Sequence, residues 1–276
     1  MSRVRTPAVA GSFYPANPST LARQVDGWLE QARPSVVGAP AALIVPHAGY
    51  VYSGPVAAAA YATLRALPPS RPAPRVLLLG PCHFLPLRGV VHPDVDALCT
   101  PLGEVRVDPE LHRRAARLGH VSASMEAHEL EHSLEVQLPF LQRALGAFTV
   151  LPLLVGRTGA EDVAALLDAL WAPDVLPVVT SDLSHHLPYE HARRVDQATV
   201  EQVLALRAPL EVDNACCAVA ISGLLLAARR RGLRPVLLDL RSSGDASGER
   251  AGVVGYGAFV FYPPTQPLHP RPEDSS

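Results

Sequence analysis

Short apolar runs alternate with longer amphipathic segments along this chain of 276 residues. An unbroken apolar run indicates a buried strand, whereas apolar positions three and four residues apart indicate a helix. The apolar runs predict strands near residues 41–45, 75–79, 148–155, 175–180, 235–240 and 252–262, with shorter strand-like pieces near 89–92 and 104–107. The amphipathic segments predict helices near residues 19–33, 55–67, 109–118, 127–145, 160–171, 190–206 and 214–231.

Strands that alternate with helices of this length favour the α/β class, with a largely parallel or mixed central sheet covered by helices on both faces. No repeat or linker divides the chain, so we predict a single domain over residues 1–262. Its first 18 residues are expected to form an extended arm. Residues 263–276 are rich in proline and polar side chains, which predicts a disordered tail.

Composition narrows the class of function. The formal net charge of −2 offers no attraction for nucleic acid or for an anionic membrane. No apolar run approaches the roughly 18 residues of a spanning helix, and the N-terminus lacks a signal peptide's apolar region. We therefore expect a cytoplasmic protein. All 24 basic residues are arginine, which excludes a Schiff-base lysine and a P-loop lysine.

Three predicted strands are each followed within a few residues by a histidine, namely His47, His83 and His185. In open α/β sheets, ligands bind beyond the carboxyl ends of the strands. A single histidine at a strand end often only bonds a loop, but three in the same setting favour a shared site. The pattern therefore predicts that imidazoles converge on one metal ion or substrate.

Two aspartates lie in the same kind of setting. Asp182 precedes His185 by three residues, where it can orient the imidazole, join the same site or only cap the next helix. Asp245 follows the predicted strand 235–240 in a loop of small residues, where an ordinary turn is the simplest interpretation. Combined with His47 and His83, however, Asp245 would complete the two-histidine, one-carboxylate set that binds non-haem Fe(II).

A competing motif lies in the predicted helix 127–145. Residues 128–132 match the H-x-x-E-H pattern, and residues four positions apart share one face of a helix, as zinc ligation requires. A zinc hydrolase that uses His128 and His132 is therefore a remote alternative. So short a motif arises by chance, and an acidic helix face is usually only solvated. We therefore favour the strand-end site.

The four cysteines show no C-x-x-C spacing. Cys216 and Cys217 fall in an apolar segment that predicts a buried helix, so both are interpreted as reduced, buried, small hydrophobic residues. Cys82 differs because it precedes His83 at a strand end, where a thiol can act beside a site.

Six segments, taken together and in order, resemble the Memo family, known in prokaryotes as AmmeMemoRadiSam system protein B. They span nearly the whole chain up to about Tyr262. The fold of this family resembles that of class III extradiol dioxygenases of the LigB type, which hold a non-haem iron with two histidines and a carboxylate. The matching segments are residues 9–15, 46–50, 80–83, 131–135, 181–185 and 242–245.

The resemblance assigns roles by position. It implies that His47 and His83 are metal ligands and that His185 is the acid/base residue, with Asp182 as its neighbour. Animal Memo proteins carry a cysteine as third ligand after Ser-Ser-x, where this chain has Asp245 if its serine pair sets the register. A carboxylate there favours Fe(II), with copper, zinc or no metal as alternatives. The residues expected to line the site are Tyr50, Cys82, Glu131, His132 and Ser243.

The leading hypothesis is thus an iron-dependent, dioxygenase-like or other redox activity on a small substrate. The alternative is a non-catalytic protein that binds a ligand or partner. The prokaryotic family name implies a pathway shared with AMMECR1-like and radical-SAM proteins, which are the expected partners. No nucleic-acid or membrane partner is expected.

Overall fold

The computed structural model describes residues 3–32, 36–66, 73–264 and 269–270. Its strands are β1 (Val4–Arg5), β2 (Val36–Val37), β3 (Ala42–Val45), β4 (Arg75–Pro81), β5 (Val90–His92), β6 (Ala97–Thr100), β7 (Gly103–Val107), β8 (Val121–Ala123), β9 (Thr149–Val155), β10 (Val175–Thr180), β11 (His185–Leu187), β12 (Arg234–Ser242), β13 (Val253–Tyr262) and β14 (His269–Pro270). Its α-helices are α1 (Pro18–Gln31), α2 (Tyr50–Tyr61), α3 (Pro109–Ala115), α4 (Met125–Glu129), α5 (Leu138–Leu145), α6 (Ala160–Leu170), α7 (Tyr189–Leu204), α8 (Ala218–Arg230) and α9 (Ser243–Ser247). Short 3-10 helices are η1 (Ala62–Ala66), η2 (Glu135–Gln137) and η3 (Val212–Asn214).

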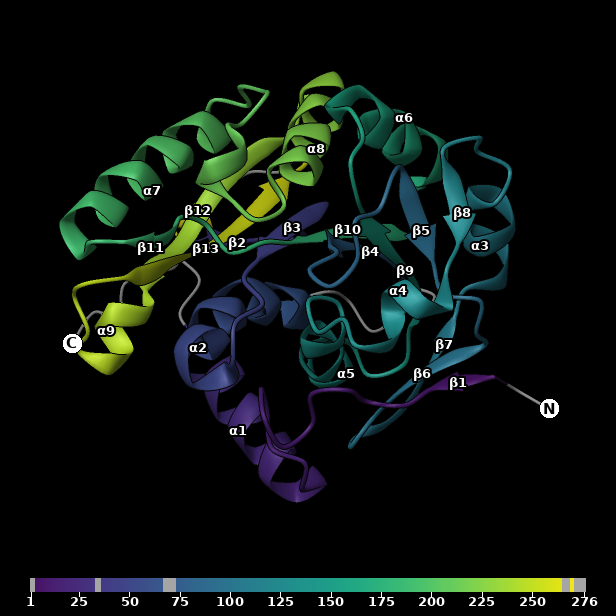
Figure 1. Cartoon of the computed structure of the whole chain (residues 1–276), viewed down its shortest axis with the longest axis horizontal. Coiled ribbons are helices and arrows are strands. Elements are labelled where there is room, and N and C mark those ends of the chain that lie inside the picture. The colour runs from purple at the N-terminus through teal and green to yellow at the C-terminus, as the bar shows by residue number, and fades with distance from the viewer. Residues whose placement is uncertain (1–2, 33–35, 67–72, 265–268, 271–276) are drawn as a thin grey trace.

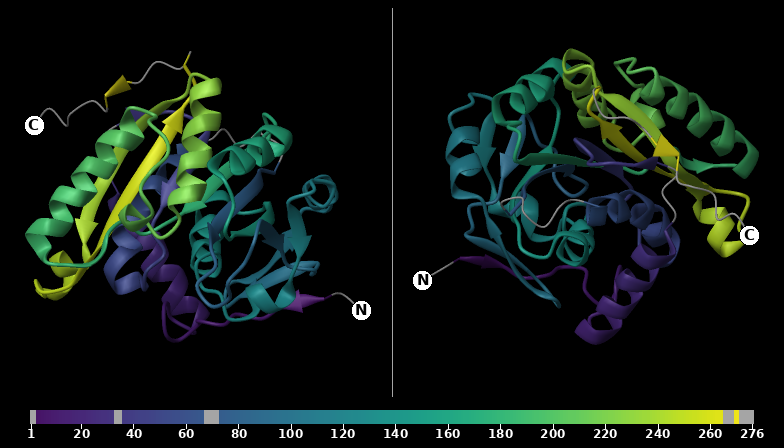
Figure 2. Two further views of the ribbon diagram at one scale, coloured as in Figure 1. Left: turned by 45° about the horizontal axis from the view of Figure 1, so that its top comes forward. Right: turned by 180° about the vertical axis from the view of Figure 1, so that it is seen from behind.

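A mixed sheet runs through the molecule, with helices on both of its faces (Figure 1). Its strand order is β1-β6-β7-β9-β4-β10-β3-β13-β11, and β12 pairs with β13. The central strands β9, β4, β10 and β3 are mutually parallel, whereas β13 runs antiparallel to β3. Helices α6, α7 and α8 cover one face, and α1, α2 and α5 cover the other, as the turned views also show (Figure 2). The predicted α/β class with a mixed, doubly covered sheet is confirmed.

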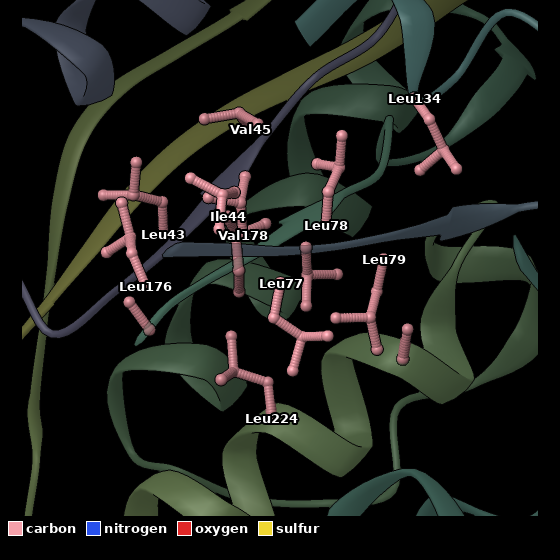
Figure 3. Packing of buried hydrophobic residues seen from close by; sticks show 14 of the residues in the cluster. Leu43, Ile44, Val45, Leu77, Leu78, Leu79, Leu134, Leu176, Val178 and Leu224 are labelled. Atoms are coloured by element: carbon pink, nitrogen blue, oxygen red, sulfur yellow. The ribbon is translucent and has the colours of Figure 1, made fainter. Parts of the chain in front are cut away.

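The core lies where the central strands are covered on both faces. All four residues of β3 are buried, as are all of β4 except Arg75, which explains why these strands lack a polar alternation. Leu77 and Leu79 point toward the helix that carries Leu224, and Leu78 points the opposite way (Figure 3). Both faces of the central strands are thus packed, which leaves the ends of these strands as places for polar chemistry.

The N-terminal arm is held against the sheet by a buried carboxylate. Glu135 accepts hydrogen bonds from the Arg5 guanidinium at 2.7 Å, the Tyr14 hydroxyl at 2.6 Å and the Ala8 N–H at 2.7 Å. The Arg5 side chain is only 3 % exposed and the Glu135 side chain is fully buried. A buried ion pair of this kind is costly to break because one charge would then be left without its partner.

The prediction of one helix over residues 127–145 is wrong. The chain forms α4, then an irregular stretch, then η2 and α5. In the irregular stretch the N–H groups of His132 and Ser133 donate to the Glu131 carboxylate, so they do not continue the helical ladder. The predicted helix 214–231 also begins later, at Ala218. The predicted tail falls largely outside the described residues; within them, His269–Pro270 forms β14.

Candidate metal centre

Three neighbouring parallel strands deliver the polar side chains of this site. Strand β10 lies between β3 and β4 and pairs with both, so their carboxyl ends meet at one edge of the sheet. His47 lies two residues after β3, His83 two residues after β4, and Thr180 is the last residue of β10. A Cβ atom on Gly80 would lie 2.7 Å from the Thr180 methyl carbon, so only glycine permits this close approach.

His47 is buried and held from both sides. Its backbone N–H donates to the Asp182 carboxylate at 2.8 Å, and its ring Nδ1 lies 3.0 Å from Thr180 Oγ1. Thr180 Oγ1 in turn accepts a hydrogen bond from Gln137 Nε2. Burial, helped by the nearby charges of His83 and His132, lowers the pKa of His47 well below its usual value. His47 is therefore neutral near pH 7, which is the form that binds metal ions.

His83 is oriented by the carboxylate of Glu131. The ring Nδ1 of His83 lies 2.9 Å from Glu131 Oε1, and the His83 backbone N–H donates to Glu131 Oε2 at 2.6 Å. The N–H groups of His132 and Ser133 complete the coordination of this carboxylate. Burial by itself would raise the pKa of Glu131, but the hydrogen bonds from His83 and Ser133 outweigh it and lower the pKa to about 2. Glu131 is thus a fixed negative charge behind His83.

The third donor at this point is the thiol of Cys216. Its Sγ lies 3.3 Å from His47 Nε2 and accepts a hydrogen bond from the Asp182 backbone N–H at 3.2 Å. Burial and the Asp182 carboxylate raise the pKa of Cys216 to about 12. One ligand atom each from His47, His83 and Cys216 lies within 4.8 Å of the other two. Such a spacing allows one ion to contact all three atoms.

His132 lies beside this group. Its ring centroid is 4.7 Å from that of His83 and 5.7 Å from that of His47. His83, Glu131 and His132 form a second group of donor atoms within 4.8 Å of one another. Because Glu131 already accepts four N–H groups, this second group orients His83 and is the weaker candidate for a ligand set.

Asp182 bonds the His47 backbone, and His185 lies close enough to His47 and His83 to interact with them electrostatically. Burial raises the pKa of Asp182 to about 7, although the N–H groups of His47 and Ala48 oppose the shift. His185 begins β11, and burial lowers its pKa, with a smaller contribution from the charges of His186 and His83. The Asp182 carboxyl can therefore change protonation state near neutral pH, and the lowered pKa of His185 favours its neutral imidazole.

Asp245, the predicted third ligand, is not brought to the histidines. One of its oxygens accepts from the Tyr189 hydroxyl at 2.6 Å, and the other accepts from the Ser242 N–H at 2.7 Å, which caps α9. Neither group of donor atoms found among the described residues includes Asp245. The physical reason is the sheet order, since β13 separates β12 from β3 by about 10 Å. The donor atom beside the two histidines is instead the Cys216 thiol.

Two residues expected to line the site, Tyr50 and Ser243, form their contacts in other parts of the fold. Tyr50 is a core residue, because its hydroxyl donates to the Val136 carbonyl and its ring packs on Phe140. Ser243 begins α9, and its hydroxyl accepts a hydrogen bond from the Val254 N–H. Glu131 and His132 do lie at the site, and Cys82 lines a cavity beside Cys216.

The zinc-helix alternative does not fit this structure. His128 is buried in α4, and its Nε2 lies 3.1 Å from the Val91 carbonyl. Helix α4 ends at Glu129, so His128 and His132 do not share a helical face. Among the described residues, His128 belongs to no group of potential metal ligands.

Sequence reasoning missed Cys216, Thr180 and Gln137. The available signal for Cys216 was its place just before the apolar run of α8, since helix N-termini often carry reactive thiols. Its neighbour Cys217 is buried and packs in the core as predicted. Thr180 was the last residue of a predicted strand, but nothing in the pattern showed that it faces His47.

Fold and site together define a class: α/β proteins with converging imidazole and thiol donors at the carboxyl edge of a mixed sheet. The chain belongs to the Memo family. The family described as Memo-like protein matches residues 5–260. A MEMO1 family protein of Aquifex aeolicus is 35 % identical over 272 residues, covering 94 % of this chain and 99 % of that protein. A MEMO1 family protein of Aeropyrum pernix is 36 % identical, covering 93 % and 99 %.

A solved structure shares the fold. The crystal structure of an uncharacterized protein from Escherichia coli K12 superposes with a TM-score of 0.53 at 14 % identity, covering 80 % of this chain and 98 % of that one. This likeness concerns the fold alone. No helix in the described ranges combines the length and apolar character needed to cross a membrane.

Proposed function

We propose that this Memo-family protein holds one transition-metal ion on His47, His83 and Cys216 and uses it in redox chemistry on a small substrate. The observation that carries the proposal is the convergence of three donor atoms within 4.8 Å of one another. His47 and His83 follow strands β3 and β4, and Cys216 precedes helix α8.

The donor set fits a metal ion in its details. Thr180 faces Nδ1 of His47 and Glu131 faces Nδ1 of His83, which leaves Nε2 of each ring as the available nitrogen. Metal-binding histidines usually donate their other ring N–H to an oxygen in this way, which fixes the tautomer and the ring orientation. A metal ion also deprotonates a coordinating thiol, which overcomes the raised pKa of Cys216.

The identity of the metal follows from the donors. Imidazole suits iron, copper and zinc alike, whereas a thiolate shifts the preference toward softer ions than a carboxylate does. We therefore propose iron, the metal favoured by the sequence, and copper, one of its alternatives, as equal candidates for a redox site. When bound, either ion would supply electron transfer and polarise a substrate oxygen.

The remaining polar residues supply proton transfer and positioning. The neutral imidazole of His185 can accept a proton from a substrate hydroxyl and return it later. Asp182 positions His47 through the backbone hydrogen bond and donates no side-chain group to the metal set. Glu131 is a positioning residue that acts through His83.

Metal content tests the proposal. Untagged, metal-free protein is loaded anaerobically with Fe(II) or Cu(I), freed of excess ion and analysed by mass spectrometry. We expect about one ion per wild-type chain and only background in the His47→Ala, His83→Ala double variant. Glu131→Gln should retain the ligands but weaken metal affinity by about 10- to 100-fold, because it removes the charge behind His83.

Two variants control this experiment. His191→Ala removes an exposed histidine of α7 and should leave the metal content unchanged. Cys216→Ser preserves the shape of the site, so reduced copper content in a normally folded variant supports the thiol ligand. Full metal content in the double-histidine variant would contradict the assignment and would leave ligand binding without a metal as the function of the site.

A further inference from the structure

A cavity of about 660 Å³ opens beside the proposed metal centre. Cys82 and Cys216 are among the residues that line it, and Cys216 is also the thiol that faces His47. The cavity extends between the segments that follow β4 and β9 and the first turn of α8. Its volume falls within the range of small-molecule sites. A molecule bound there would have one end next to the metal centre.

Most of the cavity wall is apolar. Leu85, Leu87, Val155 and Val219 contribute side chains to it, and Val212 forms an exposed rim. No aspartate or glutamate is among the residues that line it. The wall therefore favours an apolar body and contains no carboxylate to attract a cation.

Two arginines provide the only charged groups of the lining, Arg88 and Arg157. They face each other across an isolated β-bridge, and opposed residues of a bridge project to the same side. Among the described residues, neither guanidinium forms an ion pair or a hydrogen bond with a side chain. By contrast, Arg75, Arg143 and Arg230 are each paired with carboxylates.

Guanidinium groups carried by opposed residues of a bridge, exposed and without carboxylate partners among the described residues, are well suited to bind an oxyanion. Each can donate two parallel N–H groups to a carboxylate or phosphate. The first turn of α8 also lines the cavity and contributes more weakly to anion binding, because the N-terminal end of a helix dipole is positive.

We propose that this cavity is the substrate pocket and that it takes a small molecule with an apolar body and one oxyanion, a carboxylate or a phosphate. The oxyanion binds Arg88 and Arg157, and the body extends past Cys82 toward Cys216. This assignment rests on the proposed metal centre for its catalytic meaning. The arginines then select the substrate and fix which end of it reaches the metal.

Three naphthalene probes test the assignment by isothermal titration calorimetry: 1-naphthyl phosphate, 1-naphthoate and neutral 1-naphthol. We expect at least one anion to bind the wild-type protein about tenfold or more tightly than naphthol does. The Arg88→Gln, Arg157→Gln double variant should lose up to about 100-fold in anion affinity, with naphthol binding unchanged. The stronger of the two anions distinguishes a phosphate from a carboxylate substrate.

The matched control is the Arg23→Gln, Arg117→Gln double variant, which changes the net charge equally at exposed positions outside the cavity. Anion affinity should stay at the wild-type level in this control. An equal loss in both double variants, equal binding of naphthol and the anions, or no anion binding at all would overturn the proposal.

Metal content, measured on the same samples, separates this proposal from the proposed function. Arginine-dependent anion binding in a protein that binds no iron or copper would support the pocket and contradict the metal centre. A protein that binds metal through His47 and His83, but binds anions equally well without Arg88 and Arg157, would support the metal centre and contradict the pocket.

Discussion

At the scale of single residues, the proposed centre depends on partners that fix each donor atom. Thr180 and Glu131 hold the two imidazoles by their Nδ1 atoms, and Asp182 holds the backbone of His47. His47 and His83 were recognisable in the sequence because each directly follows an apolar run. Cys216 was not, because an apolar segment looks the same whether its first residues are helical or precede the helix.

His128, which the H-x-x-E-H motif offered as a zinc ligand, is expected to affect stability instead. Burial lowers the pKa of His128 to about 3, although its hydrogen bond with the Val91 carbonyl favours a higher pKa. An unfolded histidine titrates near pH 6.5. Between these pH values the unfolded chain holds one more proton than the folded chain, so His128 makes the free energy of unfolding fall as pH falls, by up to about 1.4 kcal/mol per pH unit.

His128→Gln should therefore reduce the acid sensitivity of the fold. In urea denaturation at pH 7, 6, 5 and 4, the variant is expected to lose about 1.4 kcal/mol less per pH unit than the wild type below pH 6. The exposed His191→Gln serves as control and should follow the wild-type slope. A wild-type slope in His128→Gln would show that His128 is not kept neutral by the fold.

At the scale of elements, local interactions broke a helix that periodicity predicted. Between α4 and η2, backbone N–H groups bond the buried Glu131 carboxylate, and Arg5 bonds the carbonyls of His128 and Glu131. Arg5 lies 123 and 126 residues from these two carbonyls, so no local window of residues could reveal its contacts. The central strands were predictable because burial on both faces leaves a continuous apolar run.

Substitution of two glycines, Gly255 in β13 and Gly27 in α1, tests how closely neighbouring elements pack. A Cβ atom on Gly255 of β13 would overlap the Asp196 carboxylate of α7, which accepts the Ser184 N–H at 2.9 Å. Gly27 lies inside α1, and beyond its chain neighbours and the surrounding helix backbone no atom lies within 4 Å of such a Cβ. We expect Gly255→Ala to lower the free energy of unfolding by about 1–3 kcal/mol. Gly27→Ala should raise it by up to about 1 kcal/mol, because alanine favours the helix.

Chemical denaturation of both variants measures this contrast. The opposite signs matter more than the sizes, since both substitutions add the same methyl group. A neutral Gly255→Ala variant would mean that α7 and β13 separate easily. A destabilising Gly27→Ala variant would contradict the open surroundings of that position in α1.

At the scale of the whole molecule, strand order decides which side chains meet. The sequence predicted that three histidines follow strands, but it could not show that β10 lies between β3 and β4. Nor could it show that β13 separates β12 from β3, which removes Asp245 from the set. Both facts depend on long-range pairing, whereas the class of fold followed from local patterns. The resemblance to the Memo family was confirmed over residues 5–260, but it did not identify the Cys216 thiol as a candidate ligand.

The most direct test of the metal centre is X-ray absorption at the edge of the bound metal. The geometry predicts one sulfur scatterer at about 2.3 Å together with imidazole nitrogens in the wild-type protein. In Cys216→Ser, the sulfur contribution should disappear while imidazole scattering remains. A wild-type spectrum with only nitrogen and oxygen neighbours, or a sulfur signal that persists in Cys216→Ser, would contradict the His47, His83 and Cys216 centre.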